Sequence, residues 1–433
     1  MYFDNKIIII ELNEFNKELL ENAVKEINLP NIANIISFHS FTYKTNDTYE
    51  SGYLEPWVQW NSVHLGMPST EHKVKNLGET SVKFIPSMWN RLSENGISTG
   101  IFGCMNASRN RAIENKFFMP DPWMHSEPGY PKCLSNLLML PRYLAKNYRD
   151  ISILKFFKLL PPFFKSLFDL RMTMSAISIT FLSIYYRFIR KKKDYVFIVL
   201  YDVLTSSLFC KLIKNNDSNV NVIFLNSLAH IQHHYWNNIN HISDEIKWSL
   251  KKIDVAIGKI TDSHPGAAFV FHNGLSQLNT NDDKPWIGYR QKNPEEFYQA
   301  IGIEGARVEQ NMTHDGHLIF NDQQKADDAF KILISALINK EKLFHLEKKY
   351  DNEFKIFYRL DITDDLAASS KMFCNHREYN FFDLFDRIVM RTGKHMPIGT
   401  IYSNKINFSG IEYNHQFNSY IYKYLGLPEH ADE

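Results

Sequence analysis

The chain contains 433 residues, of which 44% are hydrophobic and 22% are charged. This is the composition of an ordinary globular protein, and the length allows a large buried core. The formal net charge is only +1, so the overall charge does not favour a nucleic-acid partner, and we expect none.

The first hundred residues alternate strand-like and helix-like segments, as α/β proteins do. Residues 7–13 are a continuous apolar run that ends in polar residues, which is typical of a central parallel strand. Because side chains alternate along a strand, Glu11 and Asn13 share one face and can reach one site beyond the strand end. The further elements expected here are helices at 15–27 and 87–95 and a strand at 97–102.

The start of the chain and its cysteines indicate a cytoplasmic protein. The apolar run at 7–10 is too short for a signal-peptide core, and Glu11 follows it. The four cysteines have no CxxC spacing, which favours reduced thiols.

Residues 133–195 differ in composition from the rest of the chain. They combine Phe- and Leu-rich segments with lysines and arginines, among them the run 191–193. We expect a helical cap inserted into one α/β core that is formed by 1–132 and 196–433. The alternative is a basic, aromatic surface that touches an anionic membrane, which would make the protein peripheral to the inner membrane.

Strand-like and helical patterns then resume. A strong amphipathic helix is predicted at 243–259, where apolar residues repeat on one stripe. The other expected elements are strands at 195–204, 220–225, 267–271 and 354–360, a helix at 326–338 and a helical tail at 410–427.

Two motifs carry the candidate chemistry. The first is Asn226-Ser-Leu-Ala-His230, which follows the predicted strand at 220–225 and continues into His233 and His234. The second is Gly393-Lys-His395. The first motif lies at the carboxyl end of a predicted strand, which is where open α/β sheets bind ligands.

These two motifs resemble the Asp-x-x-x-His and Gly-x-His elements of the alkaline-phosphatase-like superfamily, which includes type I phosphodiesterases and nucleotide pyrophosphatases. The resemblance implies a mostly parallel central sheet sandwiched by helices, and two divalent metals about 4 Å apart that clamp a phosphoryl group. The remaining landmarks of that family can be traced in order along nearly the whole chain.

Several landmark positions depart from the family. Asn226 stands in place of aspartate, and Phe271-His272-Asn273-Gly274 stands in place of Ser-Asp-His-Gly. The segment from Glu55 to Ser62 shows no clear nucleophile, although Ser62 is within the alignment error. With fewer carboxylates, a full two-metal site would be under-neutralised, so we predict that the protein lacks one.

A smaller metal site remains open. His230, His272 and His395 could hold one zinc or manganese ion, with Glu11 completing the set. The alternative is that these histidines are hydrogen-bonding pocket residues without a metal. The residues predicted to be catalytic are Glu55, His230 and Glu11, with Glu55 as a general base. Those predicted to bind substrate are Asn13, Trp57, Gln59, Asn226, His233, His234 and Asn273.

Three functions are compatible with this sequence. The first is an enzyme that acts on a small phosphate-linked or glycan substrate, for example a transferase in surface-polysaccharide biosynthesis. The second is a metal-dependent phosphodiesterase with unusual ligands. The third is a non-catalytic binding protein that has kept the pocket. The sequence does not specify the oligomeric state.

Overall fold

The computed structural model describes residues 6–45, 54–80, 85–109, 114–147, 151–236, 241–280, 286–311, 314–350 and 353–428. The chain divides into two compact units. The first comprises Met1–Leu140, Leu159–Asn281 and Thr392–Glu433, and the second comprises Pro141–Lys158 and Asp282–Arg391.

A seven-stranded sheet forms the centre of the first unit, in the order β2-β19-β6-β1-β5-β3-β4. Neighbouring strands from β6 to β4 pair in parallel, whereas β19 is antiparallel to both β6 and β2. The strands are β1 (Ile7–Leu12), β2 (His39–Lys44), β3 (Thr99–Phe102), β4 (Asn115–Met119), β5 (Val220–Leu225), β6 (Ala268–His272) and β19 (Ile398–Ser403). The predicted α/β fold with a mostly parallel sheet is therefore confirmed.

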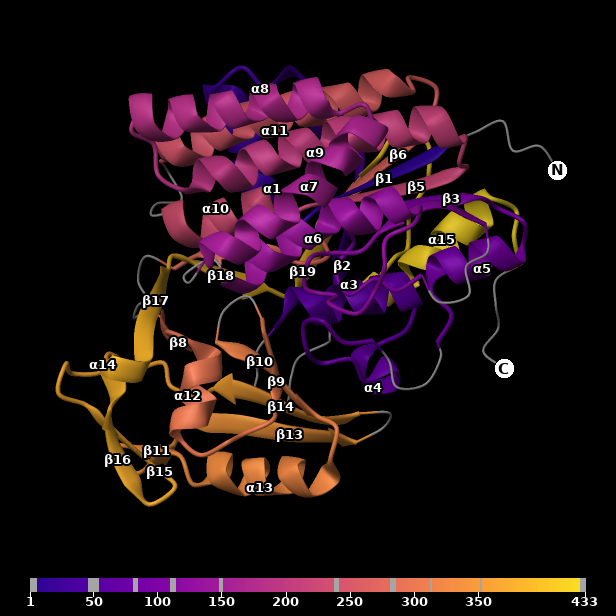
Figure 1. Cartoon of the computed structure of the whole chain (residues 1–433). Coiled ribbons are helices and arrows are strands. Elements are labelled where there is room, and N and C mark those ends of the chain that lie inside the picture. The colour runs from indigo at the N-terminus through magenta and orange to yellow at the C-terminus, as the bar shows by residue number, and fades with distance from the viewer. Residues whose placement is uncertain are drawn as a thin grey trace. The chain divides into compact units, whose positions relative to one another are not determined.

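Helices cover both faces of this sheet (Figure 1). Ile8, Ile10 and Leu12 of β1 join a core that is closed by α1 (Lys17–Glu26), α2 (Pro30–Ile36), α9 (Tyr195–Asn216), α10 (Ser227–Tyr235) and α11 (Asp244–Ser263). Asp254 of α11 fixes the start of α2, because its carboxylate accepts the backbone N–H groups of Asn31 and Ile32 at 2.9 and 2.8 Å. The other face of β1 presents Glu11, which contacts His64 of α3 (Pro56–Leu65).

The remaining elements of the first unit are short or peripheral. The two-stranded antiparallel sheet of β7 (Ser276–Asn279) and β18 (Gly393–Met396) lies outside the main sheet and matters for the site. The others are α4 (Ser69–His72), α5 (Met88–Glu94), α8 (Thr173–Ile184), the π-helix η1 (Tyr185–Ile189), the 3-10 helix η2 (Asn414–Gln416) and α15 (Phe417–Tyr424). Helices α6 (Lys132–Asn147) and α7 (Ile153–Asp169) cross the boundary between the units.

The second unit is built on antiparallel sheets, which the sequence analysis did not anticipate. One sheet has the order β13-β14-β10-β9 and another β12-β11-β15-β16, and β17 pairs with β8. Its strands are β8 (Trp286–Gln291), β9 (Arg307–Gln310), β10 (Asp315–Phe320), β11 (Leu337–Ile338), β12 (Glu341–Lys342), β13 (Phe344–Tyr350), β14 (Phe354–Leu360), β15 (Lys371–Cys374), β16 (Arg377–Asn380) and β17 (Phe385–Arg391). Its helices are α12 (Pro294–Ala300), α13 (Gln323–Ile334) and α14 (Phe381–Leu384).

The strand predicted at 195–204 is wrong, because these residues begin the 22-residue helix α9. A short apolar run does not distinguish a buried strand from a buried helix. By length and composition α9 is also apolar enough to cross a membrane, yet 61% of its most apolar window is buried within the protein. Its contacts with α11 and the sheet identify it as a core helix. The division into a core and a cap at 133–195 stays a prediction.

Candidate functional site

The candidate site lies where β1 ends and the chain turns sharply. The backbone N–H of Asn13 donates to Leu225 O of β5 at 3.0 Å, and that of Glu14 donates to Asn273 O after β6 at 3.0 Å. Glu14 adopts a left-handed conformation with φ of 58°, which breaks the strand alternation. Its carboxylate is thereby directed toward α10 and the β7–β18 sheet.

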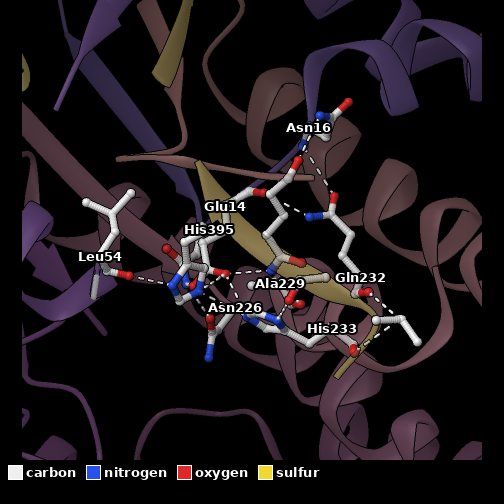
Figure 2. Close-up of polar contacts among 12 residues, drawn as sticks. Glu14, Asn16, Leu54, Asn226, Ala229, Gln232, His233 and His395 are labelled. Carbon is white, nitrogen blue, oxygen red and sulfur yellow. Dashed lines mark hydrogen bonds and ion pairs between the residues drawn. The ribbon is translucent and has the colours of Figure 1, made fainter. Parts of the chain in front are cut away.

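Two imidazoles meet the Glu14 carboxylate, those of His233 on α10 and His395 on β18 (Figure 2). Glu14 Oε2 lies 2.9 Å from His233 Nε2 and 3.1 Å from His395 Nε2. The two Nε2 atoms are 3.2 Å apart. We call these residues the Glu14 triad. The two imidazoles are 13% and 12% exposed, so solvent still reaches them.

The outer ring nitrogens of both histidines are bonded to backbone carbonyls. His395 Nδ1 donates to Leu54 O at 2.5 Å, and His233 Nδ1 donates to Gly393 O at 3.1 Å. Because a carbonyl can only accept, the proton of each neutral imidazole lies on Nδ1. Both Nε2 atoms then present lone pairs to each other and to the carboxylate.

Three convergent acceptors need a cation or an added proton between them. Ligand atoms about 2.0–2.1 Å from a tetrahedral zinc ion are roughly 3.3 Å apart, close to the separations of 2.9, 3.1 and 3.2 Å in the triad. Zinc-binding histidines commonly donate their second N–H to a carbonyl or carboxylate, as both do here. The triad therefore fits a single zinc-like ion.

Surrounding amides hold the Glu14 carboxylate in place. Asn13 Nδ2 donates to Glu14 Oε1 at 2.8 Å and also to Asn226 Oδ1 at 2.8 Å. Gln277 Nε2 donates to Glu14 Oε2 at 2.5 Å. Burial opposes the charge on Glu14, but the attraction of His395 and His233 in their protonated forms outweighs it and lowers the pKa of this carboxyl well below its usual range.

The Gly-x-His motif has a physical reason in the pairing of β7 and β18. His395 pairs directly with Gln277 across β18 and β7, so both side chains reach Glu14 from one face. A Cβ atom at Gly393 would lie 2.4 Å from Gln277 Oε1. A larger residue at 393 would therefore displace the amide that positions the carboxylate.

Helix α3 starts next to the triad. Leu54 O, which accepts from His395, precedes Glu55, and Glu55 is the N-cap residue of α3. The predicted general base is thus one residue from a direct contact of the triad. The N-terminus of a helix also favours negative charge, including phosphate groups.

A second group of possible metal ligands comprises Glu11, His64 and Cys104. All three are buried, and His64 Nε2 lies 2.8 Å from Glu11 Oε1, so this nitrogen donates to the carboxylate. Within the described part of the chain His64 Nδ1 has no hydrogen-bond partner, and burial raises the pKa of the Cys104 thiol well above its usual range. A metal ion here would have to displace both the proton between His64 and Glu11 and the thiol proton, so this group is less prepared for a metal than the Glu14 triad.

His272, predicted as a metal ligand, lies in an apolar stack. Its ring is 4.4 Å from that of Phe417 and nearly parallel to it, and it meets Trp60 edge-on at 4.9 Å. Its Nε2 is 4.0 Å from Glu11 Oε1, and neither ring nitrogen has a hydrogen-bond partner among the described residues. Burial, with a contribution from His64, lowers the pKa of His272 to about 3. His272 is therefore not brought together with His395.

His233, and not His230 as predicted, is the histidine of α10 that contacts His395. The ring of His230 lies 4.6 Å from that of His234, one turn further along α10. His233, expected only to bind substrate, is the histidine that joins His395. Glu14 was not selected at all, because strand alternation pointed to Glu11 and Asn13. The available signal was its position as a carboxylate directly after the first strand, at the end where open α/β sheets bind ligands.

Three of the residues predicted to bind substrate instead form hydrogen bonds inside the protein. Trp57 Nε1 donates to Lys75 O at 2.9 Å, and Gln59 Oε1 accepts from Asn414 Nδ2 at 2.9 Å. Asn273 donates to Phe15 O at 2.7 Å and accepts from the backbone of Thr400 at 2.8 Å. All three side chains are buried, so the structure does not place them on an open cleft.

Ser62 is not arranged as a nucleophile. The backbone N–H of Val74 donates to His72 Nδ1 at 3.0 Å, which leaves the imidazole proton on Nε2. This Nε2–H points at Ser62 Oγ at 3.0 Å, and the hydroxyl donates to Val58 O at 3.2 Å. His72 therefore cannot take a proton from Ser62, which is fully buried within α3.

An open hollow of about 240 Å³ lies on another side of the β7–β18 sheet, lined by residues that include Asn16, Ser276, Met396 and Thr400. Because side chains alternate along β18, Met396 faces away from the side of His395. The hollow is thus separate from the Glu14 triad.

No protein-family model and no curated protein sequence matches the chain. Among solved structures, it is similar to murine ectonucleotide pyrophosphatase/phosphodiesterase 5 in complex with AMP, with 7% identity, a TM-score of 0.44 and coverage of 99% of this chain and 97% of the other. It is similar to phosphonoacetate hydrolase from Sinorhizobium meliloti, with 11% identity, a TM-score of 0.43 and coverage of 96% and 95%. TAB5 alkaline phosphatase gives 11% identity, a TM-score of 0.40 and coverage of 98% of both chains.

Proposed function

We propose that this protein is a metal-dependent enzyme that acts on a phosphate ester, with the Glu14 triad holding one divalent ion. The observation that supports the proposal most strongly is the convergence of three acceptor atoms within 3.2 Å of one another. Two of them belong to imidazoles whose protons are held on the opposite nitrogen by backbone carbonyls. Such a set is prepared for a cation before any ligand arrives.

Charge supports a phosphate substrate. One carboxylate and two neutral imidazoles carry a charge of −1, so a divalent ion would leave the site positive and attractive to an anion. A bound divalent ion would supply Lewis-acid stabilisation of the phosphoryl oxygens. The start of α3 adds the positive end of a helix on the same side as His395.

The protein's own groups have distinct tasks in this proposal. Glu14, His233 and His395 hold the ion, and Asn13 and Gln277 orient the Glu14 carboxylate. Glu55 accepts the proton of the attacking water or hydroxyl group. Asn226, which is bonded to Asn13 and lies beside the two histidines in Figure 2, is available to bind a substrate oxygen.

The glycan-transferase version of the proposal is weakened by two aromatics. Trp57 and Trp60 are buried, and both indole N–H groups donate within the protein, so neither offers a face for a sugar ring. The cytoplasmic location stays a proposal, and the four unpaired cysteines support it.

Hydrolysis of bis-(p-nitrophenyl) phosphate tests the proposed function. Purified protein is stripped with a chelator and assayed with and without added zinc or manganese. We expect activity that is restored by metal and lost in His395→Ala. His39→Ala, a change at an exposed histidine of β2, is the matched control and should be fully active. Turnover that survives both chelation and His395→Ala would refute the proposal.

A further inference from the structure

Helix α8 and the π-helix η1 show a reversed distribution of side chains. A surface helix of a globular protein usually buries its large apolar residues and exposes polar ones. Here the small residues Ala176 and Ser183 are buried. The large residues Met174, Ile177, Phe181, Ile184 and Phe188, which follow one another at helical spacing of three or four, are 41% to 74% exposed.

These five residues, which we call the apolar stripe, lie on the outer side of a helical layer. In Figure 1 α8 is at the margin of the first unit, next to α9 and α11. Polar groups near the stripe are satisfied without water, since the hydroxyls of Thr180 and Ser183 donate to the carbonyls of Ala176 and Ile179 at 2.8 Å. Such bonds are suited to an apolar environment.

Positive charge borders the stripe at both ends. Residues 164–193 contain seven basic residues and one acidic residue, Asp169, although the whole chain has a net charge of only +1. Lys165 and Arg171 lie before α8, Arg190 and Lys191 lie after η1, and all four are exposed. Arg187 and Lys193 pair with Asp194 and Glu245, and the other basic residues leave a local excess of positive charge beside the apolar stripe.

The apolar stripe and its basic ends together indicate which kind of partner fits this face. A second copy of the chain would bring a like-charged face against it, which is unfavourable. An anionic bilayer offers negative headgroups to the basic ends and hydrocarbon to the stripe. Helices α8 and η1 together contain 17 residues, fewer than the roughly 20 needed to span a bilayer, and their inner side packs on α9.

We propose that the apolar stripe and its flanking basic residues bind the surface of an anionic membrane, with α8 lying in the plane of the interface. This proposal is independent of the proposed enzymatic function. The full-length protein is tested by co-sedimentation with vesicles of phosphatidylcholine alone and of phosphatidylcholine mixed with phosphatidylglycerol, at about 0.05 M and 0.5 M salt.

We expect binding to the anionic vesicles at low salt and at least tenfold weaker binding at high salt. Phe181→Ser/Phe188→Ser should weaken binding about tenfold or more, because it removes apolar side chains that enter the interface. Arg190→Glu/Lys191→Glu should weaken binding to the anionic vesicles about tenfold or more, because it reverses two charges that attract the headgroups. The matched controls are Val255→Ser on α11 and Lys423→Glu on α15, both at exposed positions, and they should bind like the parent protein.

All four altered positions in the test variants are exposed or border solvent, so unchanged circular dichroism is expected and is checked first. Absence of binding at low salt would overturn the proposal, as would equal binding by the parent protein and both double variants. Light scattering that shows a dimer broken by Phe181→Ser/Phe188→Ser, without vesicle binding, would assign the stripe to a second copy instead.

Discussion

His272 should make the stability of the protein depend on pH in a way that one substitution removes. The imidazole is fully buried between Phe417 and Trp60, and its pKa falls from 6.5 to about 3 because burial disfavours the charged form. The folded state therefore resists protonation, whereas the unfolded state takes up a proton below pH 6.5. The contribution is fully present above pH 6.5 and is lost as the pH falls toward 3.

The size of the effect follows from the two pKa values. Each pKa unit corresponds to about 1.4 kcal/mol, so the loss between pH 7 and pH 5 is roughly 2 kcal/mol. His272→Phe removes the titrating group and keeps a flat ring that can stack on Phe417. Any constant packing cost of the larger ring affects both pH values equally and cancels in the comparison.

Urea unfolding followed by tryptophan fluorescence at pH 7 and pH 5 measures this difference. We expect the parent protein to lose about 2 kcal/mol more than His272→Phe over this interval. Equal losses in the two proteins would show that His272 is hydrated or charged in the folded state. The apolar stack described for it would then be incorrect.

Three further outcomes follow from other contacts. Ser62→Ala should retain turnover and lose only about 1 kcal/mol of stability, since its hydroxyl bonds within the protein; a tenfold loss of activity would restore it as a nucleophile. Asp254→Ala should lower the free energy of unfolding by about 3 kcal/mol and leave metal binding unchanged, because it removes charged hydrogen bonds to the start of α2; unaltered urea midpoints would argue against this. Glu55→Gln should keep the metal but lower turnover at least tenfold, and a fully active variant would exclude Glu55 as the base.

The sequence predicted those elements whose apolar residues follow a simple run or a regular helical spacing. The isoleucine run before Glu11 and the stripe of the helix at 243–259 predicted β1 and α11 closely. Residues 195–204 were misassigned because a helix buried over most of its surface has no polar side to reveal its period. The antiparallel sheets at 286–391 were missed because most of their strands are short and their pairing depends on contacts that are distant in sequence.

Some residues that the sequence motifs singled out lie at the candidate site. His233 and His395 belong to the Glu14 triad, and Asn226 is bonded to Asn13 beside it. Glu14 was missed because its positive φ changes the direction of its side chain from the one that strand alternation predicts. Which of His230 and His233 faces His395 depends on the rotation of α10, which motif spacing alone does not fix.

The Glu14 triad is proposed to hold one divalent ion. Equilibrium dialysis against zinc, followed by elemental analysis, measures this directly in the parent protein and in His233→Ala, His395→Ala and His230→Ala. We expect one tightly held zinc ion per chain in the parent and in His230→Ala, and its loss in the other two variants. Zinc that is retained in His233→Ala but lost in His230→Ala would contradict the triad, and so would a parent protein that binds none.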